Sequence, residues 1–465
     1  MQRVQASWVS GFAPLLTEAR ATLRLAAPIA LAQLSFIAMN TTDVILLAWL
    51  GSESLAAASL GMNLYFIMFV SALGIAIAVA PMAAQARGRG DDDAMADALH
   101  QGLWASTLVA APLAGSLWFG GDFLRFIGED AAISAQSEIF LRALLWGLAP
   151  AMWFTVLRSF IAVLDRVNVV LAIGMFGVLF NAIFNYGLIF GHFGLPALGI
   201  IGSGIASSTV NAVMFVLLAA YVLLHPRLRR LGLWHGLARF KPRRLIELFR
   251  LGLPISGAFM LEVGLFSAAG LLMGYVGTAA LAAHQIALQV AGTTFMVPLG
   301  ISQAATIRVG YHIGAGDHPA AGRAGWLAFA LGAGFMSTMA VTIWIVPRSI
   351  VRLFLDESLP GNETVAAIAV TFLAVAALFQ VFDGTQTIGT GVLRGLKDTQ
   401  VPMLLAAIGY WGVGFPLAAA LGFGFDLGGI GVWIGLAASL ATVAGLMLWR
   451  WSRRGRLLSK ASSAG

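Results

Sequence analysis

Three carboxylates stand inside stretches that are otherwise apolar enough to cross a membrane: Asp43, Glu262 and Asp383. A charge near the centre of a bilayer is costly, and such residues usually face a cavity or mark an ion pathway. Because no Lys or Arg falls at matching depth in the expected helices, we expect a mobile cation to be their partner. Asp43 falls late in its helix, which leaves an acid at the membrane interface as the alternative there.

Amide and hydroxyl side chains recur at helical spacing in the apolar segments, several of them beside these acids. Their oxygens, together with the carboxylates, are hard ligands that suit Na⁺ or a proton relay better than a transition metal. The Na⁺ candidates are therefore Glu262, Asp383 and Asp43, whereas each amide or hydroxyl alone could instead join neighbouring helices. The supporting residues are Gln33, Asn40, Asn181, Asn185, Gln285, Gln289, Gln380 and Thr387.

The composition indicates which elements must position these residues. Of 465 residues, 59% are hydrophobic and 11% are charged, whereas soluble proteins have roughly 25% charged residues. The charge-free stretches are long enough for helices that cross about 30 Å of hydrocarbon, and they are apolar throughout rather than alternating as barrel strands do. We expect an all-α integral membrane protein with twelve transmembrane helices and no room for a soluble domain.

The sequence repeats itself at a spacing of 226 residues. Leu23–Pro28 reads LRLAAP and Phe249–Pro254 reads FRLGLP, and the match continues without a gap to Asp91 and Asp317. Shared low complexity is the alternative, but aligned Pro, Arg, Phe and Asp argue against it. The repeat predicts two six-helix pseudo-symmetric halves around a central cavity, with substrate bound between them near the midplane. The expected domains are 1–224, a basic cytoplasmic linker at 225–247, and 248–465.

The placement of Lys and Arg predicts the orientation of the chain. Of the 28 Lys and Arg residues, four fall on one side of the expected helices, and the rest lie with the termini and the linker. By the positive-inside rule both termini are cytoplasmic, and we expect a multi-pass protein of the bacterial inner membrane. This topology, with some attraction to anionic lipid, explains the basic linker, so we expect no nucleic acid as a partner. The four exceptions are Arg125, Arg142, Arg348 and Arg352.

Several function classes are excluded by what the sequence lacks. It has no Cys, which excludes thiolate metal sites and Cys nucleophiles. It has no Walker A sequence and no loop of ATPase size, so the chain is not an ATP-driven pump by itself. A membrane enzyme would need a nucleophile–base set or a metal cluster at membrane depth, where only isolated carboxylates occur. We therefore expect no enzyme activity and no cofactor other than a coupling ion.

Six motifs occur in a fixed order along the chain. TDVILLA stands at 42–48, and FMLEVGLF, LAAHQIALQ, IRVGYHIGAGD, FQVFD and GVLRGLKD stand at 259–266, 281–289, 307–317, 379–383 and 391–398. This set resembles the multidrug and toxic compound extrusion (MATE) family, and the second half is most similar to its bacterial NorM-like branch. The resemblance implies that Glu262 and Asp383 are the cation-coupling carboxylates and that Asp43 acts with Asn181 and Asn185.

One departure bears on the coupling ion. Sodium-coupled members of the family can carry a Tyr four positions before the Asp that corresponds to Asp383, where this chain has Phe379. The substitution removes one possible oxygen ligand, so Na⁺ and H⁺ both stay open.

The favoured hypothesis is a secondary active multidrug efflux antiporter that exports cationic amphipathic compounds in exchange for Na⁺ or H⁺ by alternating access. An anionic, partly apolar cavity would attract organic cations and drugs, and we expect a monomer. The alternative is a lipid-linked precursor flippase of a related fold. That function would require several cationic residues around the cavity, and the sequence places none within the expected spans.

Overall fold

The computed structural model describes residues 2–229, 233, 236, 239–356, 358–455 and 457, and the chain forms helices and no strand across them. The linker residue Arg230 lies outside the described residues. Eleven helical segments of the described chain are long and apolar enough to cross a membrane, and a pair bent by 54° at residue 119 makes a twelfth. The expectation of an all-α membrane protein with twelve spans is confirmed.

Two compact units make up the chain: residues 31–257, here the N-terminal unit, and residues 1–30 with 258–465, here the C-terminal unit. The boundaries fall inside two long helices, α1 (Gln2–Leu50) and α11 (Pro242–Val276). Each of these helices therefore contributes one end to each unit. The domain limits inferred from the repeat, with a separate linker at 225–247, stay a prediction from the sequence.

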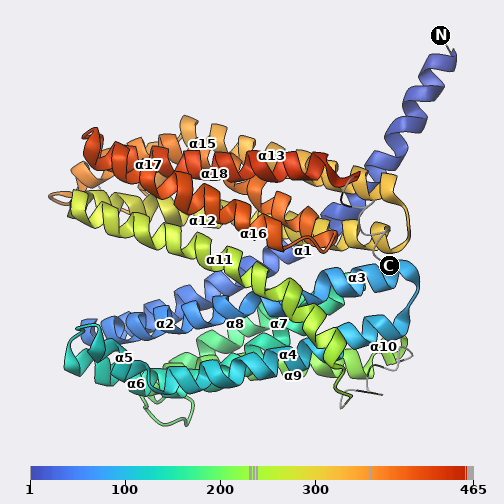
Figure 1. Ribbon diagram of the computed structural model, residues 1–465. Coiled ribbons are helices and arrows are strands. Elements are labelled where there is room, and N and C mark those ends of the chain that lie inside the picture. The colour runs from blue at the N-terminus through green and yellow to red at the C-terminus, as the bar shows by residue number, and fades with distance from the viewer. Residues whose placement is uncertain are drawn as a thin grey trace. The chain divides into compact units, whose positions relative to one another are not determined.

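In the N-terminal unit, α2 packs against α4, α6 and α7, and α9 packs against α6, α7 and α8 (Figure 1). The helices of this unit besides α1 and α11 are α2 (Ser52–Ile77), α3 (Val79–Arg89), α4 (Asp92–Trp118), α5 (Gly120–Phe126), α6 (Ala131–Leu144), η1 (Leu145–Gly147), α7 (Leu148–Val163), α8 (Val167–Phe190), α9 (Ile200–Leu224) and α10 (Pro226–Arg229).

In the C-terminal unit, α15 is the central helix and packs against α12, α13 and α18 (Figure 1). Two segments, η2 and η3, are π-helical, a form that often marks a functional position. The helices of this unit besides α1 and α11 are α12 (Thr278–Gly314), α13 (His318–Ile345), α14 (Pro347–Val351), α15 (Asn362–Gly395), α16 (Gln400–Ala407), η2 (Ile408–Gly414), α17 (Phe415–Ala419), η3 (Ala420–Gly424) and α18 (Gly428–Ser452).

The sequence repeat produces the same helix boundary in each unit. Gly90 follows α3 with φ +71°, and Gly316 follows α12 with φ +76°, a left-handed conformation that Gly adopts at little cost. The next residue is an N-cap in both places: Asp91 accepts a hydrogen bond from the backbone of Ala94, and Asp317 accepts one from that of Ala320. Equivalent residues therefore end one span and begin the next at the same point of the repeat.

Each unit also contains the same close helix contact at the repeat spacing. A Cβ on Gly300 of α12 would come within 2.8 Å of the carbonyl oxygen of Ala26 of α1. A Cβ on Gly74 of α2 would collide in the same way with the backbone of Gly252 and Ser256 of α11. Only Gly permits backbones to approach this closely. These contacts explain why the part of α1 before residue 31 belongs to the C-terminal unit and the part of α11 before residue 258 belongs to the N-terminal unit.

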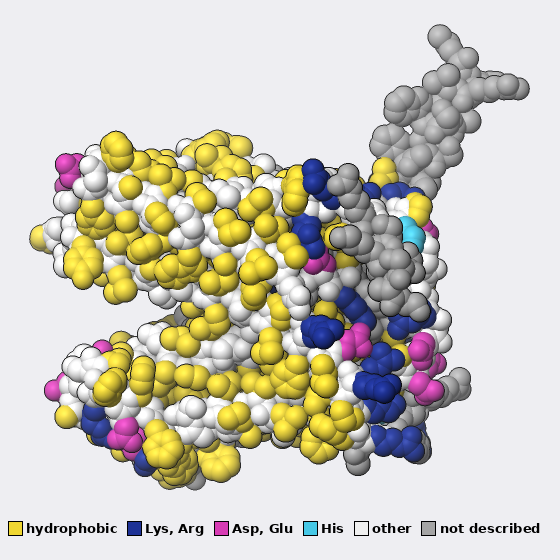
Figure 2. Space-filling model, in the orientation of Figure 1, with side chains coloured by type: hydrophobic (Ala, Val, Ile, Leu, Met, Phe, Trp, Pro, Cys, Tyr) yellow, Lys and Arg dark blue, Asp and Glu magenta, His cyan; other side chains and the backbone are white. Residues whose placement is uncertain are grey.

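The surface separates apolar from charged side chains. On the face that Figure 2 shows, exposed hydrophobic side chains cover the middle of the helices in each unit, and most Lys and Arg side chains gather near the helix ends. Soluble proteins rarely expose apolar patches of this extent. Together with the twelve apolar spans, this surface identifies a multi-pass membrane protein.

Candidate functional site

The C-terminal unit brings together two of the three predicted carboxylates. Glu262 lies on α11 and Asp383 on α15, and one amide, that of Gln386, joins them. Gln386 Nε2 donates to Glu262 Oε1 at 3.0 Å and lies 3.2 Å from Asp383 Oδ1. Asp383 and Gln386 are three residues apart on one face of α15 and are 6% and 2% exposed. Two acids from separate helices therefore share a single polar bridge.

The same amide continues the network to a third helical segment. Tyr410 of the π-helical segment η2 is buried, and its hydroxyl donates to Gln386 Oε1 at 3.0 Å. Thr387 Oγ1 lies 3.1 Å from Gln386 Nε2. Two carboxylate oxygens and a hydroxyl oxygen thus surround the amide nitrogen, and hard oxygens of this kind suit a monovalent cation or a proton. Within the described residues no group of three or more His, Cys, Asp or Glu could hold a metal ion by itself.

The expectation that no Lys or Arg reaches the depth of the carboxylates is wrong for Glu262. Arg394 is 7% exposed, lies over the ring of Phe259 at 5.0 Å, and is close enough to Glu262 for their charges to interact. The helix α15 continues without a break from Asp383 through Arg394 to Gly395. The two acids and this guanidinium therefore carry a formal net charge of one negative.

The N-terminal unit binds its single predicted carboxylate differently. Asp43 of α1 accepts three hydrogen bonds, from Asn185 Nδ2 at 2.6 Å, Asn181 Nδ2 at 3.0 Å and Ser207 Oγ at 3.1 Å. The two Asn side chains come from α8 and are 1% or less exposed, and Ser207 comes from α9. Their Oδ1 atoms are buried without a hydrogen-bond partner. These three hydrogen bonds offset part of the cost of burying the carboxylate.

A buried Arg also lies at the corresponding place of this unit. Arg158 of α7 donates to Gln33 Oε1 at 2.6 Å and lies over the ring of Phe36 at 5.6 Å. At the repeat spacing, Gln33 and Phe36 correspond to Phe259 and Glu262, the two residues that Arg394 meets. The flippase alternative requires several cationic residues in the spans, and these two arginines each engage neighbouring side chains.

The remaining predicted polar residues lie outside both clusters. Asn40, Gln285 and Gln289 have exposed side chains and take no part in the hydrogen bonds of either cluster. Gln380 is buried, and its Oε1 accepts a hydrogen bond from Thr294 at 2.8 Å, so it joins α15 to α12. The helical period predicts that these residues lie on polar faces of their helices, but it does not predict which face contacts a carboxylate.

Three residues of the two clusters were not predicted from the sequence. Gln386 follows Asp383 by three residues, a spacing that could have placed it on the stripe with the acid. Tyr410 stands in an apolar segment, and the match of Leu198–Gly199 with Leu427–Gly428 pairs it with Asn181. Ser207 carried no signal of its own, because small hydroxyl residues are common in transmembrane helices.

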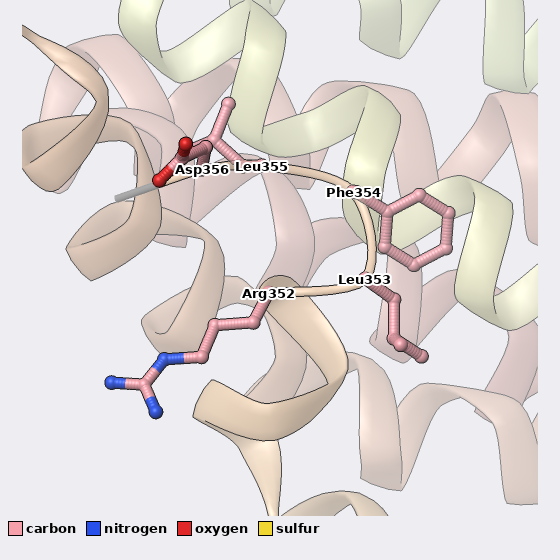
Figure 3. A pocket seen from close by; sticks show the side chains of 5 residues that line it. All are labelled: Arg352, Leu353, Phe354, Leu355 and Asp356. Carbon is pink, nitrogen blue, oxygen red and sulfur yellow. The ribbon is translucent and has the colours of Figure 1, made fainter. Parts of the chain in front are cut away.

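A surface pocket lies apart from these clusters, in the segment between α14 and α15. It is lined by consecutive residues from Arg352 to Asp356, with neither carboxylate of the pair among them (Figure 3). Ser358 donates to Asp356 through its hydroxyl and its backbone N–H, and these bonds lower the pKa of Asp356. The pocket is accordingly a property of this connecting segment and not of the carboxylate cluster.

A comparison with protein families matches the two halves of the chain separately. A family model described as MatE matches residues 28–187 and 254–420. The chain belongs to the MatE family. The two matched segments begin at Pro28 and Pro254, the start of the repeat. Because the members are named as transporters, the expectation that the chain is not an enzyme is confirmed.

Curated relatives match almost the whole chain. "Probable multidrug resistance protein NorM" from Mesorhizobium japonicum is 46% identical over 442 residues, 95% of each chain. The protein of the same name from Brucella suis is 43% identical over 433 residues, 93% of this chain and 92% of that one. The resemblance to the NorM-like branch is therefore confirmed.

Solved structures establish the fold independently of these names. A Vibrio cholerae MATE transporter matches with a TM-score of 0.86 at 17% identity, over 96% of this chain and 98% of that one. A eukaryotic MATE transporter matches with a TM-score of 0.82 at 20% identity, over 96% of this chain and 99% of that one. At these identities the likeness concerns the fold, and the twelve-helix architecture is confirmed.

Proposed function

We propose that the chain is a secondary active antiporter that exports cationic amphipathic compounds in exchange for Na⁺ or H⁺ by alternating access. The coarser part, a multidrug efflux transporter, follows from its family and from relatives named as multidrug resistance proteins. The finer part rests mainly on one observation, the buried pair Glu262 and Asp383 joined by a neutral amide. Charged side chains at membrane depth usually mark ion pathways.

The clusters supply binding sites whose affinity for an organic cation depends on whether an ion is bound. An unoccupied pair of carboxylates attracts a positively charged compound, and an Na⁺ ion or a proton at the same oxygens neutralises that attraction. Entry of one monovalent charge down the membrane potential supplies about 2.3 kcal/mol per 100 mV. The ion thereby drives release of the compound, and the cluster around Asp43 is a second place where it binds.

The distribution of Lys and Arg along the chain supports a membrane location and an orientation for this exchange. The termini and the linker carry most Lys and Arg, which favours cytoplasmic termini in the bacterial inner membrane. The transported partners are organic cations and drugs, and one chain with two units is a sufficient transporter. No cofactor besides the coupling ion takes part in the proposed cycle.

Efflux from vesicles tests the exchange. The purified chain in proteoliposomes is expected to move a cationic dye faster under an imposed Na⁺ or pH gradient. Glu262→Gln and Asp383→Asn each remove a cation-binding charge and are expected to lower gradient-driven efflux by about tenfold or more, the effect of 1.4 kcal/mol. The exposed Glu129 offers a matched control, because Glu129→Gln removes a carboxylate outside the cluster. Unchanged coupled efflux in both cluster variants contradicts the assignment.

A further inference from the structure

Besides the two carboxylates, the site between Glu262 and Asp383 has one side-chain oxygen close by, Thr387 Oγ1, which lies 3.1 Å from Gln386 Nε2. One turn before Asp383, Phe379 is 1% exposed and packs edge-on against Trp433 at 5.3 Å and Phe266 at 6.0 Å. This side of the acid is therefore lined by aromatic rings and has no ligand to offer. Two carboxylate groups and one hydroxyl are still few ligands for Na⁺, which binds through several oxygens, so a further ligand has to come from another neighbour.

Gln386 occupies the place where such a cation would lie. Its Nε2 group, which carries the positive end of the amide dipole, is within 3.2 Å of oxygens of both acids. Its Oε1 faces away from them and accepts from the Tyr410 hydroxyl. The residue therefore presents its donor end to the carboxylates and keeps its best cation ligand on the opposite side.

A half-turn of the amide exchanges these two ends without moving the rest of the side chain. The terminal torsion of Gln is broad and roughly two-fold, so both orientations are accessible. The Tyr410 hydroxyl can accept a hydrogen bond as well as donate one, so it would pair with Nε2 after the turn. The amide oxygen would then face oxygens of Glu262, Asp383 and Thr387, an arrangement that a cation among them would stabilise.

We propose that Gln386 is a ligand and selectivity residue for Na⁺: its amide turns when the ion binds, so that Oε1 coordinates the ion together with Glu262 and Asp383 while Tyr410 accepts from Nε2. This inference rests on the proposed antiport. A proton bound to either carboxylate needs no third oxygen, so proton binding leaves the amide in place. Gln386 thereby separates the two coupling ions.

The charge of the site agrees with a single monovalent ion. With both carboxylates ionised, Glu262 and Asp383 together with Arg394 carry a formal net charge of one negative, which one Na⁺ neutralises. The turned amide adds an oxygen without adding charge, as the donor set for a weakly bound monovalent ion requires.

Binding of ²²Na⁺ to the purified full chain, combined with dye efflux, tests the proposal. Gln386→Met keeps the length of the side chain and removes the oxygen, and it is expected to weaken Na⁺ binding about tenfold or more while leaving pH-gradient-driven efflux within about twofold of the unaltered protein. Gln380→Met is the matched control, because Gln380 is a buried amide on the same helix that bonds Thr294 and neither acid. Both measurements are expected to stay unchanged in this control.

Tyr410→Phe distinguishes a turning amide from a structural bridge between helices. In the proposal the Tyr410 hydroxyl pairs with the amide before and after the turn, so its loss affects both states and changes Na⁺ affinity by about threefold or less. A bridge that only holds α15 to η2 would lose the same bond in Tyr410→Phe and in Gln386→Met. Equal losses of Na⁺ binding in the two variants overturn the proposal.

The remaining outcomes are also decisive. Should Gln386→Met fail to fold, Gln386→Glu keeps an oxygen at the same reach and is expected to retain Na⁺ binding at alkaline pH, and loss of binding there overturns the proposal. Unaltered Na⁺ affinity in Gln386→Met does so as well. An unaltered protein that binds no Na⁺ but exports dye under a pH gradient overturns this inference alone. Absence of efflux under both gradients overturns the proposed function instead.

Discussion

Both units place carboxylates among their helices, but the side chains that surround these carboxylates differ. In the N-terminal unit Asp43 receives three hydrogen bonds from neutral donors, and the neighbouring Arg158 bonds an amide. In the C-terminal unit Glu262 and Asp383 share one amide, and Arg394 acts on an acid. The first arrangement gives one carboxylate three hydrogen bonds, whereas the second gives two carboxylates a single shared amide and so leaves them better suited to a cation.

The repeat relates the two arrangements position by position. Arg158 and Arg394 correspond in the looser part of the repeat, and they meet Gln33 and Phe36 in one unit and the corresponding Phe259 and Glu262 in the other. Moving the acid onto the position beside the Arg changes the role of that Arg from a packing group to a counter-charge. The difference between the units is therefore concentrated in a few residues on α1 and α11.

The largest expected effect comes from removing the two arginines one at a time. Arg394→Met leaves Glu262 beside Asp383 without a cation, and breaking a buried charge interaction costs about 3 kcal/mol or more of stability. Arg158→Met leaves only a neutral amide without its donor, which costs about 1–2 kcal/mol. The free energy of unfolding in detergent measures both losses.

A second substitution shows whether charge is the cause. Adding Glu262→Gln to Arg394→Met removes the uncompensated acid, and it is expected to recover at least half of the lost stability, since the acid and the Arg then no longer depend on each other. Equal losses in the two Arg variants, or no recovery in the double variant, would mean that the units do not differ in this respect.

A smaller effect is expected at the donors of the N-terminal unit. Asn185→Leu removes the shortest of the three hydrogen bonds to Asp43, at 2.6 Å, and leaves a partly buried carboxylate with two donors. Hydrogen bonds to charged groups contribute about 1.5–3 kcal/mol, so a loss of about 2 kcal/mol in the free energy of unfolding is expected. Asn40→Leu is the control, because Asn40 is an exposed amide outside the cluster.

Repeating the substitution in a chain without the carboxylate tests whether the hydrogen bond to Asp43 is the cause of the loss. In a chain that carries Asp43→Asn, the charge is absent and Asn185→Leu is expected to cost about 1 kcal/mol or less. A cost that is the same in both backgrounds would show that Asn185 serves packing rather than the carboxylate, and the contrast between the units would fail.

The sequence was most informative where a residue type is rare in its surroundings. Carboxylates are expensive in apolar spans, so Asp43, Glu262 and Asp383 stood out and all three lie in polar clusters. Asn181 and Asn185, one helical turn apart, likewise meet a common partner because residues at that spacing share a face. The repeat and the hydropathy together predicted the twelve helices. Hydropathy is informative here because backbone groups in lipid must form their hydrogen bonds within the spanning segment, so an apolar span of this length forms a helix.

The sequence does not predict which residues contact the acids. Helical periodicity identifies the face of a helix on which a residue lies, but not the helix that packs against that face. Gln285 and Gln289 share a stripe as regular as that of Asp383, yet their side chains are exposed. Tyr410 meets Gln386 because η2 is π-helical, and the local sequence gives no sign of that widening. Arg394 lies within α15, although the sequence predicted no Lys or Arg at the depth of the carboxylates. Long side chains at span ends can instead turn inward when an acid lies within reach.

The smallest expected effect isolates the third donor to Asp43, for which the C-terminal unit has no counterpart. Ser207→Ala removes a hydrogen bond of 3.1 Å and is expected to lower the free energy of unfolding by about 1 kcal/mol. The adjacent Ser208 donates to the backbone oxygens of Ala143 and Leu144, so Ser208→Ala removes bonds to neutral acceptors in the same helix. Adding Asp43→Asn should abolish most of the cost at Ser207 and leave the cost at Ser208 unchanged. If both costs persist, Ser207 supports helix packing, and the N-terminal unit holds its acid with two amides, which is closer to the single amide that joins Glu262 and Asp383.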